Sequence, residues 1–163
     1  MFVGGPTRDD SMASIQKRIA FGFVAAVISV LIFHQGMWTT LHYLNLPGLG
    51  MPPPFPMDPV PPFGVPRIVS LCFWGGVWGA LFGAVWHGRR SSTWWAGILL
   101  GIIAGAFGLL VVLPLKGLPF AGGWVLNNWI KSMLINGTWG LGVGLLLTVL
   151  PLQTTSRDST ARA

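Results

Sequence analysis

The chain has 163 residues, of which 52% are apolar and only 9% are charged, and its net charge is +6. Soluble domains carry about 25% charged residues, so this composition excludes an ordinary water-facing surface, and the length fits a single domain. The basic residues form no run interleaved with aromatic residues, which argues against a nucleic-acid-binding surface.

The N-terminal part of the chain contains a short polar segment and then the first apolar stretch. We expect residues 1–16 to be disordered and cytoplasmic, and a four-helix transmembrane domain to cover residues 17–152. Its first span covers about residues 19–40 and follows Lys17 and Arg18. This charge pattern also occurs in signal peptides, but no small-residue cleavage site follows, so we interpret the segment as a helix of the mature protein.

A proline-rich external loop follows at residues 47–65, and nine prolines occur between Pro47 and Pro66. Such a segment cannot form a helix or a central strand, and it should be extended and polyproline-like. Apolar residues such as Phe55 and Met57 lie between the prolines, so we expect a stiff cap on the outer ends of the helices. The alternative is a free ligand for proline-recognising modules.

The second span is expected at about residues 66–86 and the third at about 94–113. Pro66 suits the first turn of a helix, and Pro114 ends the third span. The short turn from His87 to Thr93 should force these two helices into an antiparallel hairpin.

The fourth span is expected at about residues 129–150, with a disordered cytoplasmic tail at 153–163. The sequences of residues 76–79 and 137–140 are similar, and each ends in Trp-Gly. The chain is therefore either two hairpins related by an axis along the membrane normal, or two glycine-rich helices that resemble each other by chance.

Stripes of small residues are the most informative pattern in the chain. Residues four apart share one helix face, and a face without side chains lets two backbones approach closely in a membrane. We therefore predict glycine-mediated close packing, in the manner of a glycine zipper, with grooves that face either the chain interior or a neighbouring subunit. The stripes are Gly75, Gly79 and Gly83; Gly97, Gly101 and Gly105; and Asn136, Gly140 and Gly144.

Large rings follow the same spacing beside the first stripe. Trp74, Trp78, Phe82 and Trp86 recur every fourth residue. They predict either a ridge that packs within the bundle and towards lipid, or an interface with another protein.

The distribution of basic residues predicts the orientation. Lys and Arg are enriched on cytoplasmic sides, so both termini should be cytoplasmic. The predicted inner side carries Arg8, Lys17, Arg18, Arg89, Arg90, Arg157 and Arg162, and the outer side carries Arg67, Lys116 and Lys131.

Polar residues near the outer side form a candidate cluster that would favour an anionic head group or a small anion. Polar side chains within spans are costly and so suggest function, but they also form ordinary interhelical hydrogen bonds and interfacial contacts. The cluster consists of His34, Gln35, His42, Arg67, Lys131, Ser132 and Asn136.

The sequence offers no catalytic group, metal site or cofactor. Its only acidic residues, Asp9, Asp10, Asp58 and Asp158, lie outside the expected spans, and no nucleotide-binding or serine-nucleophile motif is present. Weak copper and haem alternatives rest on a few His and Met residues without ligand spacing. Cys72 lies alone in a span and is interpreted as a small apolar residue.

The sequence segments at 33–36, 61–66 and 134–140 resemble segments of small, uncharacterised four-helix proteins of the bacterial inner membrane. That resemblance covers about residues 20–150 and implies the membrane but no activity. The bilayer and other membrane subunits, or further copies of the chain, are the expected partners, and nucleic acid is not. We therefore expect a non-enzymatic helix-packing subunit or scaffold; the alternative is a small permease, channel or lipid-binding protein that uses the outer cluster.

Overall fold

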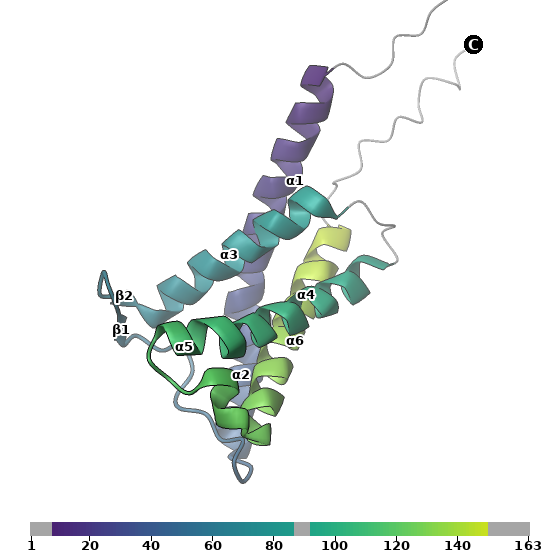
Figure 1. Ribbon diagram of the computed structural model, residues 1–163. Coiled ribbons are helices and arrows are strands. Elements are labelled where there is room, and N and C mark those ends of the chain that lie inside the picture. Colours follow the sequence, from purple (N-terminus) through teal and green to yellow (C-terminus); the bar gives the residue numbers. More distant parts are fainter. Residues whose placement is uncertain (1–7, 87–91, 150–163) are drawn as a thin grey trace, which may run out of the picture.

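The structure is a computed structural model that describes residues 8–86 and 92–149 (Figure 1). These residues are mostly helical, and within them four helical stretches are long and apolar enough to cross a membrane. The chain is therefore a multi-pass membrane protein. The expected turn at 87–91 and the expected tail at 153–163 lie outside the described residues.

The first stretch is one continuous helix made of α1 (Arg8–Ser29), the π-helical segment η1 (Val30–His34) and α2 (Gln35–Leu44). Its candidate span, Met12–Leu44, has 33 residues and is about 50 Å long, which exceeds the roughly 30 Å of bilayer hydrocarbon. In Figure 1 the N-terminal part of α1 extends past the other helices.

This continuous helix corrects the expectation of disorder through residue 16, which is wrong for residues 8–16. No proline or glycine interrupts that segment, so a helix nucleated in the apolar part continues into the polar part. Residues 1–7 lie outside the described part of the chain.

The proline-rich loop between α2 and α3 has little regular structure. Two short strands, β1 (Pro59–Val60) and β2 (Val65–Pro66), pair antiparallel, with Val60 opposite Val65. The loop leads directly into α3 (Arg67–Val85), where the backbone N–H groups of Arg67 and Ile68 donate to the carbonyls of Asp58 and Pro56. These bonds satisfy donors that a helix start leaves unpaired.

The second half of the chain is built from two longer helices and short connecting turns. Pro114 does not end the third stretch, because a π-helical segment before it continues into one further helical turn. The elements are α4 (Thr93–Phe107), η3 (Gly108–Val112), α5 (Leu113–Leu115), the 3₁₀ segment η4 (Phe120–Trp124) and α6 (Leu126–Val149).

The helices pack in the spatial order α3–α1–α6–α4. The most extensive contacts join α1 with α3 and α4 with α6, and the contact of α1 with α6 connects these two pairs. Consistent with this order, 39% of the spanning window is buried in the first and fourth stretches but only 22% in the second and third. The α1 and α6 helices therefore form the centre, and α3 and α4 flank them.

The expected hairpin of α3 and α4 is not a closely packed one. These helices are neighbours along the chain but make little direct contact, because each lies against a central helix. A ring contact between Trp78 and Phe107, with centroids 5.5 Å apart, joins them.

The aromatic residues of α3 do not form one continuous ridge. Trp74 is exposed, Trp78 is half-buried, and Phe82 is buried and stacked on Trp86. Residues four apart are rotated by about 40° on a helix of 3.6 residues per turn, so the row turns gradually from the outside into the core.

Candidate functional site

The candidate polar residues of the first stretch lie where α1 meets α2, at the π-helical segment. His34 and Gln35 are both buried there, although they are adjacent in sequence. Gln35 Nε2 lies 3.4 Å from His34 Nδ1, and the His34 ring lies 5.9 Å from the Trp38 ring. π-helical segments occur often at functional sites, and this one ends at the two candidate residues His34 and Gln35.

One face of α2 binds the proline-rich loop through side-chain hydrogen bonds to the loop backbone. Gln35 Oε1 accepts a 2.7 Å hydrogen bond from the N–H of Phe55. Trp38 Nε1 donates to the Pro52 carbonyl, and His42 Nδ1 lies 2.8 Å from the Met51 carbonyl. Two of the candidate residues, Gln35 and His42, thus hold the loop against the helix.

A second set of polar contacts joins the two central helices. Ser29 Oγ donates to the Trp139 carbonyl at 2.6 Å, and Trp139 Nε1 donates to the Ala26 carbonyl at 3.1 Å. Trp139 is only 2% exposed, and a Cβ on Gly142 would overlap Ser29 Oγ and the Phe33 ring. These hydrogen bonds satisfy a hydroxyl and an indole N–H that would be costly to leave unpaired in an apolar interior.

The remaining candidate residues lie in three other places. Arg67 begins α3 and forms an ion pair with Asp58 of the loop, so its charge is neutralised locally. Ser132 Oγ donates to the Gly105 carbonyl across the α4–α6 contact, and Asn136 Nδ2 donates to the Ser132 carbonyl of its own helix. Lys131 is half-buried on α6.

The expected polar cluster is therefore divided into separate sets of contacts. His34, Gln35 and His42 belong to α1–α2 and the loop, Arg67 to the loop and α3, and Ser132 and Asn136 to the α4–α6 contact. For the residues whose bonds are given above, the partner is the chain's own backbone or a neighbouring side chain. Those hydrogen bonds stabilise the fold.

Glycine-lined contacts between helices are the most regular feature of the interior. On α4, a Cβ at Gly97 would overlap the Gly140 carbonyl, and one at Gly101 would overlap the Asn136 carbonyl. On α3, a Cβ at Gly79 would overlap the Gly22 carbonyl. We name the contact between α4 and α6 the α4–α6 seam, and the contact between α1 and α3 the α1–α3 seam.

All but one of the other stripe residues lie in the same seams. Gly83 faces the Arg18 carbonyl, Gly105 faces Ser132, and Gly144 faces the Thr93 carbonyl and Trp94. Gly75 differs, because it faces the side chains of Val30 and Trp139. The grooves thus face the chain's own helices.

Sequence reasoning missed Gly22, Ser29 and the role of Trp139. Gly22 and Ala26 are small residues four apart and could have been recognised as a short small-residue motif on the first span. Ser29 continues the same region one turn later, and only its hydrogen bond to Trp139 distinguishes it from other serines.

Within residues 8–86 and 92–149, no group of three or more His, Cys, Asp or Glu side chains is placed to hold a metal ion. No protein-family model, curated protein or solved structure matches this chain.

Proposed function

We propose that this protein is a non-enzymatic helix-packing subunit or scaffold, in an oligomer or a larger complex of the bacterial inner membrane. Both termini face the cytoplasm in this proposal, because basic residues are more numerous at the ends and turns on that side. The resemblance to small bacterial membrane proteins supports the choice of membrane.

The proposed architecture has two hairpins, α1 with α3 and α4 with α6, each held by glycine-mediated close packing. The close backbone approach at Gly79 and Gly140 supports it. The proline-rich loop would cover the outer end of the first hairpin, which is supported by the hydrogen bonds that join the side chains of Gln35, Trp38 and His42 to the loop backbone. Such a bundle is a rigid element that presents fixed outer faces.

One observation carries the scaffold proposal: the exposed indole of Trp74. It is 59% exposed on α3, and it lies seven residues after the helix start at Arg67, about 10 Å along the axis. Indole prefers the membrane–water interface, whereas a residue about 10 Å inward from the end of a spanning helix would lie inside the hydrocarbon. Phe73 makes an edge-to-face contact with it, so the two rings form one exposed aromatic surface that a neighbouring helix would cover.

A comparison of two tryptophans tests this proposal. Trp95 is 60% exposed on α4, but it is the third residue of its helix and so lies near the interface that indole prefers. We expect Trp74→Leu to release the protein from its oligomer or complex and Trp95→Leu to leave assembly unchanged. Native mass spectrometry after extraction in mild detergent measures the assembled mass.

Two results would contradict the proposal. One is a wild-type protein that is a bare monomer after mild extraction and after crosslinking in the native membrane. The other is an equal loss of assembly in Trp74→Leu and Trp95→Leu, because that would show a general response to removing an indole.

The alternative, a small permease, channel or lipid-binding protein that uses the outer cluster, receives less support. Arg67 is paired with Asp58, and Gln35 and His42 bind the loop backbone. An activity that depends on His34 or Lys131, measured with His34→Ala and Lys131→Ala, would favour this alternative.

A further inference from the structure

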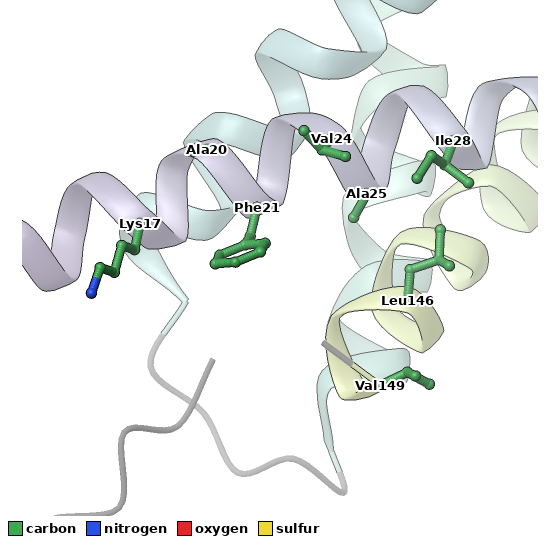
Figure 2. A pocket seen from close by; sticks show the side chains of 8 residues that line it. All are labelled: Lys17, Ala20, Phe21, Val24, Ala25, Ile28, Leu146 and Val149. Atoms are coloured by element: carbon green, nitrogen blue, oxygen red, sulfur yellow. The ribbon is translucent and has the colours of Figure 1, made fainter. Parts of the chain in front are cut away.

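An apolar groove runs along α1 beside the C-terminal part of α6 (Figure 2). It encloses about 330 Å³, which is within the range of small-ligand sites, about 300–1,000 Å³. Phe21, Ala25 and Ile28 form one wall, and Leu146 and Val149 form the other. Apart from Lys17, the residues that line it are apolar, so the body of the groove offers no hydrogen-bond partner to water or to a polar ligand.

A cationic residue, Lys17, lies at one end of this groove among the described residues that line it. Lys17 is exposed, and its ammonium group points away from the apolar wall in Figure 2. A site with an apolar body and a cationic end fits an amphipathic anion. Long basic side chains near the ends of spanning helices commonly place their charge at the head-group level.

The length of the groove matches one leaflet of a bilayer. Lys17 and Ile28 are eleven residues apart on a continuous helix, which corresponds to about 16 Å along the axis. Half of the roughly 30 Å hydrocarbon core is about 15 Å. An acyl chain lying in the groove would therefore bring its head group to the level of Lys17.

We propose that this groove binds one acyl chain of an anionic phospholipid, whose phosphate pairs with the Lys17 ammonium group. The site is separate from the outer polar cluster and from the Trp74 surface, so the inference does not depend on the scaffold proposal. A second copy of the chain is a poorer occupant, because the sequence has ten basic and only four acidic residues, and Asp58 is already paired with Arg67.

The test uses the full-length protein, delipidated in mild detergent and mixed with equal amounts of phosphatidylglycerol and phosphatidylcholine that carry the same acyl chains. Native mass spectrometry counts the lipids that remain bound. One basic residue near an anionic surface is worth about a fivefold change in binding, so we expect wild-type protein to retain about five times more phosphatidylglycerol.

Three variants separate the charge from the groove. Lys17→Gln should abolish the preference for phosphatidylglycerol, whereas Lys116→Gln, which removes the same charge from an exposed residue after α5, should preserve it. Ala20→Phe replaces an exposed lining residue and should fill the groove, so retention of both lipids should decrease. Helix content measured by circular dichroism checks that each variant is folded.

The proposal is overturned if wild-type protein shows no preference between the two lipids, or if Lys17→Gln and Lys116→Gln reduce it equally. It is also overturned if wild-type protein is a lipid-free dimer that Ala20→Phe converts to a monomer, because a second copy would then occupy the groove.

Discussion

The α4–α6 seam and the α1–α3 seam achieve close helix contact in different ways. In the α4–α6 seam a glycine stripe meets another stripe, and the backbones of both helices are close at Gly97, Gly101 and Gly140. In the α1–α3 seam the stripe on α3 meets a helix whose small residues at this contact are Gly22 and Ala26. At these three glycines the first seam is therefore backbone against backbone, and only at Gly105 does it also meet side chains, those of Ser132 and Met133. The second seam combines backbone contacts with the side chain of Ala26.

This difference teaches that the cost of substituting a stripe glycine depends on whether that glycine faces backbone or a side chain. A clash with a carbonyl can be relieved only by moving a helix, whereas a clash with a side chain can be relieved by a rotamer change or a smaller neighbour. Substitutions that add volume should therefore cost most where both partners are backbone.

The largest effect is expected for Gly101→Leu in the α4–α6 seam. Its Cβ would overlap the Asn136 carbonyl, and the rest of the side chain would push α4 away from α6. We expect the variant to lose its monodisperse folded form in size-exclusion chromatography and to lose a cooperative thermal transition.

The matched control is Gly108→Leu in the adjoining segment η3, where an added Cβ meets nothing within 4 Å. This variant should remain folded. If both variants unfold, the cost arises from glycine replacement in general; if neither does, the seam is not closely packed.

A smaller effect is expected for Gly75→Ala at the N-terminal end of the α3 stripe, where Gly75 faces Val30 of η1 and Trp139 of α6. The new methyl group would lie 2.7 Å from Val30 Cγ2, and overpacking of this kind costs about 1–3 kcal/mol. Because the obstacle is a side chain, Val30→Ala should relieve much of the cost. Unfolding free energies in mixed micelles should then show a double mutant less destabilised than the sum of the single mutants.

The smallest effects are expected for the interhelical hydroxyls. Ser29→Ala removes a bond from α1 to α6, and Ser132→Ala removes one from α6 to α4. Interhelical hydrogen bonds in membranes are worth about 0.6 kcal/mol on average. Ser29→Ala should cost more, because Ser29 is fully buried between the central helices whereas Ser132 is half-buried. An equal unfolding free energy for the two variants would contradict this ranking.

Much of the membrane architecture could be predicted from the sequence. Predominantly apolar segments of about 20 residues predict the spans at 66–86, 94–113 and 129–150, and the helices observed there differ by a few residues at their ends. The start of α1 at Arg8 could not be predicted, because the boundary of a polar extension depends on helix continuity and not on hydropathy.

The helix that packs against each glycine stripe could not be predicted, because a stripe of small residues predicts a groove but does not specify which helix occupies it. Nothing in the sequence distinguishes Gly22 as the partner of Gly79, and nothing indicates that Arg67 would pair with Asp58. The predicted polar cluster combined residues of one membrane depth, but depth does not specify which face of a helix each side chain occupies.

The most direct test of the account compares Gly140→Ala with Gly137→Ala. Both residues lie on α6, but a Cβ at Gly140 would overlap the Gly97 carbonyl, and one at Gly137 meets nothing within 4 Å. Unfolding free energies measured in mixed micelles should fall by about 1–3 kcal/mol for Gly140→Ala. Alanine favours helix by about 0.5–1 kcal/mol over glycine, so Gly137→Ala should be unchanged or more stable. Equal changes in both variants would contradict a fold held by backbone contact at the glycine seams.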